Sequence, residues 1–262
     1  MDTTRQTPPA GDATASEKTA SDQRGPDLSE RGTDHNGGEA RLNRRLFLQL
    51  QVFTGCHAHQ DVVAEVAAAG FPAVVYANVN DPRGVGLLTF SEDANHFVVA
   101  VRQLVNRGAF AALSQVSAMA MLGRTYSIGY EADLEDLLLR RPVRRVLNPD
   151  WPWAVWYPLR RAGAFESLSP AEQRTVLMEH GEIGRSFARG DLAHDIRLAC
   201  HGLDGADSDF VVGLLGAELF PLSAIVQRMR KTAQTSRYLE RLGPFFIGRV
   251  LWQARVPPGA PR

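Results

Sequence analysis

The chain has little cysteine and almost no lysine. Two cysteines, Cys56 and Cys200, are too few for a disulfide framework, and we expect both to be unpaired thiols. Lys18 and Lys231 are the only lysines, so nearly all basic charge is arginine, which suits bidentate recognition of carboxylates and other anions. The 29 basic and 29 acidic residues cancel, so no global field attracts nucleic acid or an anionic membrane.

Long apolar runs are also missing. No uninterrupted run approaches the roughly 20 residues of a membrane-spanning helix, and the first residues carry no apolar secretory signal. We therefore expect a cytoplasmic protein. The sequence contains no glycine-rich phosphate loop, no nucleophile elbow and no His-Glu-x-x-His zinc motif. These absences direct the search for function to single residues in unusual places.

The chain falls into two similar units flanked by polar segments. Residues 1–42 have almost no aromatic or branched apolar side chains, so we expect a disordered tail there, and 255–262 form a second short tail. Residues 43–130 and 151–254 each carry the order β-α-β-β-α-β, the split ferredoxin-like unit. This predicts an α+β fold in which tandem ferredoxin-like repeats pair their sheets into a barrel, with a cavity between sheet and helices.

Hydrophobic periodicity and turn signals place the elements of each unit. In the first unit we expect strands at 46–53, 71–79, 85–90 and 118–130, and helices at 60–70 and 94–106. In the second we expect strands at 153–157, 196–200, 210–215 and 244–252, and helices at 170–188 and 221–236. Between the units, residues 131–150 hold an extra helix from about 132 to 140, closed by Arg140-Arg141-Pro142.

His180 interrupts the apolar face of one predicted helix. Ser169, Pro170 and Glu172 begin this helix with a capping box and a proline at the first helical position. The inward face consists of Val176, Leu177, His180, Ile183, Gly184 and Phe187. An imidazole there needs a partner, and two interpretations stay open: a core histidine bonded to a backbone carbonyl, or an axial metal or haem-iron ligand. In the second, Gly181 and Gly184 make room for a flat macrocycle.

Arginines and phenols stand in other predicted strands. Arg197 lies in the strand after this helix, where an arginine either faces water beside an acid such as Asp195 or holds an anion. Arg124 and Tyr126 lie in a glycine-flanked strand and suit carboxylate anchoring. Tyr157 places a phenol in the aromatic stretch before the helix. Each pattern is also typical of an ordinary strand.

Together these segments resemble the chlorite dismutase-like family of haem proteins. The resemblance spans about residues 45–252. It is strongest over Trp156-Tyr157-Pro158-Leu159, Met178-Glu179-His180-Gly181 and Arg241-Leu242-Gly243-Pro244-Phe245-Phe246-Ile247-Gly248. It implies a tandem ferredoxin-like barrel assembled into a homo-oligomeric ring, commonly a pentamer, which binds haem b or coproheme. It also implies that His180 is the proximal ligand of the iron.

The resemblance assigns further residues, with alternatives. An ungapped match running back from Asp209-Phe210 puts Arg197 at the distal position of chlorite dismutases, whereas anchoring on Gly202-Leu203-Asp204 puts Asp195 there. Tyr157 resembles the reactive tyrosine of coproheme decarboxylases. Arg124, Tyr126 and Arg160 are weaker candidates for propionate contacts. Where the family often has a carboxylate beside the proximal histidine, residues 229–237 contain no acid, and Gln234 or Thr235 is the nearest substitute.

The resemblance implies a haem-dependent oxidoreductase with Arg197 and Tyr157 as its catalytic residues. The expected reaction converts chlorite, or a related oxidant, with chlorite giving chloride and dioxygen. One alternative is peroxide-dependent decarboxylation of coproheme in haem b synthesis. A further alternative is a non-catalytic haem carrier or sensor. The expected partners are a small anion or peroxide and other copies of the chain, with no nucleic acid and no membrane.

Overall fold

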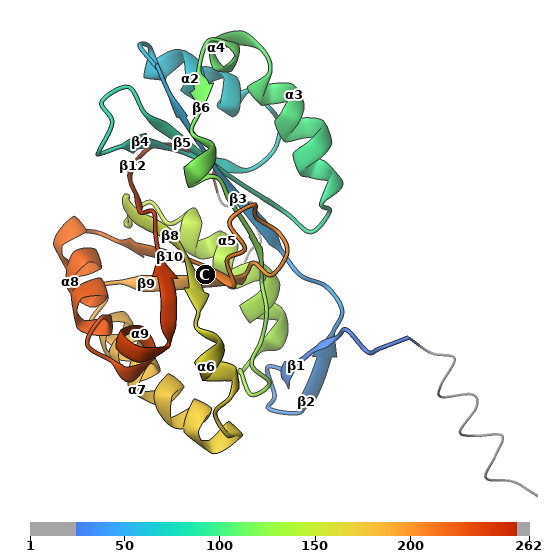
Figure 1. Ribbon diagram of the computed structural model, residues 1–262. Helices are drawn as coiled ribbons and strands as arrows, with labels where there is room; N and C mark the ends of the chain where they lie inside the picture. The colour runs from blue at the N-terminus through green and yellow to red at the C-terminus, as the bar shows by residue number, and fades with distance from the viewer. Residues whose placement is uncertain (1–24, 256–262) are drawn as a thin grey trace, which may run out of the picture.

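The computed structural model describes residues 25–255, and its centre is an antiparallel β-barrel (Figure 1). β8 pairs with both β10 and β12, which closes the sheet on itself. The strands follow around the ring as β3 (Phe47–Thr54), β5 (Val85–Ser91), β4 (Ala73–Asn78), β12 (Phe246–Gln253), β8 (Trp153–Arg161), β10 (Phe210–Gly216), β9 (His194–Ala199) and β7 (Met121–Arg124). The short strands β6 (Ser114–Gln115) and β11 (Leu239–Leu242) pair with β3 and β8.

Both halves of the barrel repeat one order of elements. The first half is β3, α2 (His59–Ala67), β4, β5, η1 (Phe97–Val101) with α3 (Arg102–Val105), and β7. The second is β8, α7 (Pro170–Arg189), β9, β10, α8 (Leu219–Met229) and β12. The connections hold α4 (Gly108–Ala111), η2 (Ser117–Met119), α6 (Gly163–Glu166) and α9 (Ala233–Tyr238). The predicted α+β fold of tandem ferredoxin-like repeats is confirmed.

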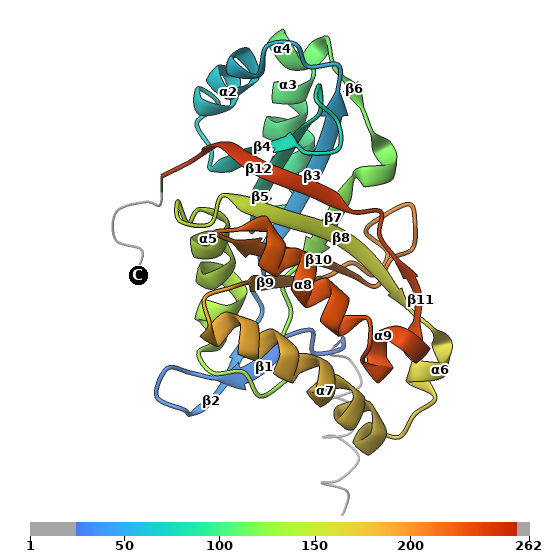
Figure 2. The same ribbon diagram turned by 90° about the vertical axis from the view of Figure 1, so that its left-hand side faces the viewer.

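Apolar clusters hold the layers together. Strand side chains that point into the barrel, among them Leu48, Trp156 and Phe246, form a central core. Outside it, α2, η1 and α3 pack on the first half, and α7 and α8 pack on the second (Figure 2). The interior is filled so closely that Gly213 is required beside Trp156, because a Cβ there would come within 2.5 Å of the indole. The strands thus present their outer faces to the helices.

The helix between the halves runs further than predicted. It continues from η3 (Asp136–Arg140) into α5 (Arg141–Val146), so Arg140-Arg141-Pro142 does not end it. Proline lacks an N–H, yet Pro142, the second residue of α5 directly after η3, does not end the helix. The leucines of this helix join the central core. The extra turn brings Arg145 to β9, where it donates to the backbone oxygen of Asp195.

The predicted disordered tail of 1–42 is wrong for residues 25–42, which are part of the folded structure. β1 (Glu30–Thr33) and β2 (Glu39–Leu42) form a hairpin. The hairpin is tied to the barrel by polar contacts: Glu30 accepts from Arg124 Nη1 and from the Ser127 N–H, both at 3.0 Å. Composition did not reveal this order because few apolar side chains carry it. Residues 1–24 and 256–262 lie outside the described residues.

One predicted helix of the second half is broken. The helix expected at 221–236 consists of α8 and α9, separated at residues 230–232. Thr232 is the N-cap residue of α9 and has an extended backbone, with φ −70° and ψ 156°. The break turns the Thr232 side chain toward α7. Among residues 25–255, no helix is long and apolar enough to cross a membrane.

Candidate functional site

Arg197 and Tyr157 lie in one row across the outer face of the barrel. Val212 of β10 pairs with Arg197 of β9 on one side and with Tyr157 of β8 on the other. Opposed residues in antiparallel strands point to the same face, so the guanidinium and the phenol leave the sheet about 10 Å apart, which is two strand spacings. Tyr157 packs with residues of α7 and α8. The register thus brings two distant predicted residues to the face that these helices cover.

Helix α7 lies over this face without sealing it. Its capping box forms as predicted, with Ser169 and Glu172 exchanging hydrogen bonds. Phe187 is buried, whereas His180 and Ile183 on the same side of the helix are only half-buried. The side of α7 that faces the sheet is therefore partly open around His180.

Thr232 holds His180 through the Nδ1 atom. Thr232 Oγ1 lies 3.3 Å from His180 Nδ1, and the same hydroxyl donates to the Met229 carbonyl at 2.8 Å. Because a hydroxyl has one proton, its oxygen accepts from histidine, and Nδ1 carries the ring proton. Nε2 then keeps its lone pair, and no side chain or backbone group of residues 25–255 hydrogen-bonds to it. This tautomer leaves Nε2 of His180 available to bind a metal.

The surroundings of His180 keep its imidazole neutral. Burial lowers the pKa of His180 to about 4, and the charges of Arg197 and Arg161 act in the same direction. Asp195 and Glu179 raise the pKa but do not reverse the shift. At neutral pH the ring is therefore in the form that a metal ligand requires.

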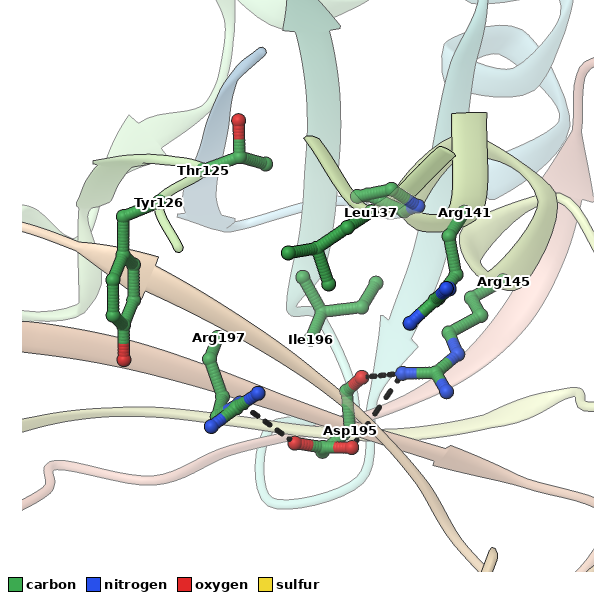
Figure 3. Close-up of a pocket in the computed structure, with 9 residues that line it drawn as sticks. Thr125, Tyr126, Leu137, Arg141, Arg145, Asp195, Ile196 and Arg197 are labelled. Atoms are coloured by element: carbon green, nitrogen blue, oxygen red, sulfur yellow. Dashed lines mark hydrogen bonds and ion pairs between the residues drawn. The ribbon is translucent and has the colours of Figure 1, made fainter. Parts of the chain in front are cut away.

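Asp195 lies on the same strand face as Arg197 and pairs with it. Asp195 Oδ2 is 3.2 Å from Arg197 Nε, and Arg145 approaches the other carboxylate oxygen at 3.5 Å (Figure 3). Burial lowers the pKa of Arg197, and the charges of Asp195, Tyr126, Glu131 and Tyr130 together raise it by more. The Arg197 side chain is 47% exposed. Both residues considered for the distal position thus reach the same face, with Arg197 as a permanent cation that solvent can contact.

Tyr157 is a buried, protonated phenol. It is 5% exposed, and its ring packs against Phe245 with 4.8 Å between the centroids. Burial raises the pKa of Tyr157 above its ordinary range, and the charge of Asp195 raises it further. The hydroxyl therefore keeps its proton at neutral pH.

Arg161 and Tyr126 complete the charged and phenolic groups near this face. The guanidinium of Arg161, at the end of β8, lies over the rings of Phe165 and Phe210, 4.5 and 4.6 Å from their centroids. Tyr126 packs against Phe210 at 5.5 Å. Burial raises the pKa of Tyr126, against the charges of Arg197 and Arg161. The structure thus places the predicted contact Tyr126 within electrostatic reach of both arginines.

Arg160 and Arg124, two of the predicted contacts, are engaged elsewhere. Strand alternation sends Arg160 to the face of β8 opposite its neighbour 161, and it pairs with Asp207 at 2.7 Å and Glu240 at 3.6 Å. Arg124 pairs with Glu30 of the N-terminal hairpin at 3.0 Å. These contacts remove both residues from the group around His180.

Both the sequence and the fold have known relatives. The profile of the chlorite dismutase family matches residues 84–251, more than half of the chain. The chain belongs to the chlorite dismutase family. A haem-binding protein from Thermus thermophilus is similar with a TM-score of 0.62 and 20% identity, covering 88% of this chain and 96% of that one. A mutant chlorite dismutase from Candidatus Nitrospira defluvii in complex with cyanide has a TM-score of 0.60 and 13% identity, covering 80% and 92%. At these identities the solved structures show a shared fold.

In this member of the chlorite dismutase family, the group beside His180 is a threonine hydroxyl. The predicted substitutes for a carboxylate, Gln234 and Thr235, both follow Thr232 on α9. Gln234 is buried in that helix, and His180 Nδ1 donates its hydrogen bond to Thr232 instead. The expectation failed because it assumed one continuous helix, in which a different residue would face α7.

Two residues of this chlorite dismutase family site had detectable sequence signals. Threonine is a preferred N-cap residue, so Thr232 could mark the start of a new helix. Alternation along a strand places residues 157, 159 and 161 on one face, so Arg161 follows from Tyr157. The sequence carried no such signal for Arg145, because its approach to Asp195 depends on how far its own helix continues past Arg140.

Proposed function

We propose that this chain is a haem-dependent oxidoreductase that acts on a small anionic oxidant, with chlorite as the expected substrate. One observation carries the proposal: neutral His180, with Nδ1 held by Thr232 and Nε2 free, faces a sheet that presents Arg197 and Tyr157. Axial histidine ligands in proteins commonly have their other ring nitrogen hydrogen-bonded in this way.

The residues present fit a haem. The side of α7 around His180 is partly open, and the sheet offers the partly buried Val212 as an apolar contact beneath it. Arg161 provides a cation on the same side, suited to a porphyrin propionate. His180 would bind the iron, and the bound group would be haem b or coproheme. The similarity to the haem-binding protein from Thermus thermophilus supports this assignment.

The bound haem would supply the redox chemistry by which chlorite yields chloride and dioxygen. Arg197 would attract and orient the anion, because its charge is permanent and its side chain is reachable from solvent. Asp195 pairs with Arg197 and limits the directions that the guanidinium can take. Thr232 is a neutral hydrogen-bond acceptor for His180, so it makes the imidazole less electron-rich than a carboxylate would.

A second candidate function is peroxide-dependent decarboxylation of coproheme. The position of Tyr157, in the same sheet row as Arg197 and beneath α7, favours it. Its raised pKa keeps the phenol protonated, so it can give up a proton together with an electron. Arg161 would then hold a propionate of the substrate itself.

Oxygen evolution distinguishes these candidates. We would add chlorite to the haem b-loaded protein on a Clark electrode, and in parallel add peroxide to the coproheme-loaded protein and separate the pigments. Oxygen release that Arg197→Gln abolishes and Tyr157→Phe retains supports the chlorite reaction. Coproheme conversion that Tyr157→Phe abolishes assigns the second function.

A haem that binds without either reaction would make the chain a carrier or sensor. Loss of haem in His180→Ala is required under all three assignments. A His180→Ala variant that retains a wild-type Soret band would overturn them together. We also propose a homo-oligomer, pentameric by family resemblance, which sedimentation equilibrium tests independently.

A further inference from the structure

A small cavity lies between strand β9 and the helix that joins the two halves. Its volume is about 100 Å³, and Arg197 of β9 and Arg141 and Arg145 of α5 line it (Figure 3). Leu137 and Ile196 provide apolar walls. This volume holds a few water molecules or one small ion, and it is well below that of a site for a porphyrin. His180 is not among its lining residues.

Positive charge exceeds negative charge at this cavity. Asp195 is the carboxylate that lines it, and Arg145 and Arg197 share that carboxylate. Arg141 is paired outside the lining with Asp136 at 3.0 Å, and Arg144 uses the same carboxylate at 2.5 Å. Each carboxylate thus serves more than one guanidinium.

The arginines around the cavity repel one another. Burial lowers the pKa of Arg145, and the charges of Arg141 and Arg197 lower it further, while Asp195 opposes them. The Arg145 side chain is 24% exposed, so water screens this repulsion only in part. An anion placed among the three guanidiniums would relieve it.

We propose that this cavity binds a small inorganic oxyanion, of the size of nitrate, between Arg141 and Arg145 on one wall and Arg197 on the other. Guanidinium groups bind planar oxyanions with paired, charge-assisted hydrogen bonds. His180 is not part of the lining, so the site is separate from any group that His180 binds, although it shares Arg197 with the proposed function. It would place a second anion next to the arginine that faces α7.

Asp195 competes with the anion for the same guanidiniums. Its carboxylate already binds Arg145 and Arg197, so an entering anion must share them. Removing the charge of Asp195 should therefore tighten anion binding, whereas removing an arginine should weaken it. These opposite changes in anion affinity distinguish an anion-binding site from an arginine cluster that only stabilises the fold.

The experiment is a calorimetric titration of the full-length protein, as purified, with sodium nitrate. Ionic strength is held constant with sodium gluconate, whose anion is too bulky for a cavity of about 100 Å³. We expect one saturable site per chain. Arg145→Gln and Arg141→Gln should each weaken binding by roughly tenfold or more, the loss typical of a charge-assisted hydrogen bond. Asp195→Asn should tighten it.

Arg144→Gln is the matched control, because Arg144 neighbours the site and pairs with Asp136 but does not line the cavity. It should keep the wild-type affinity, as should His180→Ala, which cannot bind an anion through a haem iron. Absence of saturable binding, equal losses in Arg144→Gln and Arg145→Gln, or weaker binding in Asp195→Asn would each overturn the proposal. Loss of the site in His180→Ala would overturn it too, since the anion would then lie on the iron.

Discussion

Thr232 Oγ1 accepts a hydrogen bond from His180 Nδ1 at 3.3 Å and donates its own proton to the Met229 carbonyl at 2.8 Å. The direction of the first bond is fixed by the second, because the hydroxyl has one proton to donate. The uncharged Thr232 hydroxyl therefore favours the His180 tautomer whose Nε2 is free. A neutral acceptor orients the imidazole but adds little to its basicity.

Substitutions of Thr232 distinguish its effect on the orientation of the His180 imidazole from its effect on the basicity of that imidazole. Thr232→Val removes the acceptor while keeping the shape, so haem affinity should fall by roughly 10- to 100-fold. Thr232→Ser should retain it. Thr232→Asp should make the imidazole more electron-rich and shift the iron reduction potential to more negative values. Soret titration and spectroelectrochemistry measure the two effects. Wild-type affinity in Thr232→Val would show that the bond does not hold the ligand.

The depressed pKa of His180 makes stability depend on pH. The folded-state pKa of about 4 lies below the ordinary value of 6.5, so the unfolded chain binds the proton first as the pH falls. The contribution of the neutral ring to stability is complete above about pH 6.5 and is lost as the pH falls toward 4. Urea unfolding of haem-free protein should show a decrease of up to about 3 kcal/mol from this group.

The His180→Gln variant should not show that part of the decrease, so the wild-type and variant curves should converge or cross toward acid pH. His57→Gln is the control, because His57 is exposed and the substitution leaves the buried imidazole in place. Parallel curves for wild type and His180→Gln from pH 7 to 4 would contradict the depressed pKa.

Arg161 and Arg160 provide a matched test of which face holds propionates. Arg161 lies over Phe165 and Phe210 on the side of His180, whereas Arg160 pairs with Asp207 on the opposite side. Arg161→Gln should weaken haem binding by roughly tenfold, the loss typical of one charge-assisted hydrogen bond. Arg160→Gln should change it little.

Haem dimethyl ester, which has no free carboxylates, is the control ligand for this pair. If Arg161 binds a propionate, wild type and Arg161→Gln should bind the ester equally. A loss that is the same for haem and for its ester would instead mean that Arg161 supports the site through its packing on the two rings.

Sequence periodicity was sufficient to predict the fold class because most elements of the two repeats carry their own pattern. The capping box at Ser169 and Glu172 set the start of the His180 helix, and the repeated element order predicted the paired units. Local patterns do not determine the strand register that places Val212 between Arg197 and Tyr157. It depends on long-range pairing, so the sequence could name these residues but not their common face.

The contacts of Thr232 and Arg145 were missed for one physical reason. Thr232 and Arg145 reach the site because a helix breaks in one case and continues in the other, and helix ends are decided by packing as well as by local signals. The N-terminal hairpin was missed because polar bonds to Glu30 hold it and only Ala40 and Leu42 of its apolar side chains pack on the central core. Amino-acid composition gives the apolar content of a segment but not the polar contacts that the segment makes.

The contact between Glu30 and Arg124 tests whether the hairpin is part of the folded domain. Glu30 is 15% exposed at its side chain and binds both the Arg124 guanidinium and the Ser127 N–H at 3.0 Å. Glu30→Ala leaves those donors without a partner and should lower the free energy of unfolding by about 1–2 kcal/mol. Glu39→Ala, at a side chain that is 77% exposed, should change it by less than about 0.5 kcal/mol. Urea denaturation gives both values, and hydrogen exchange should show faster opening of the hairpin in Glu30→Ala. If the two variants have equal stability and the hairpin exchanges as fast as an unfolded peptide in wild type, the segment is the disordered tail that its composition predicts.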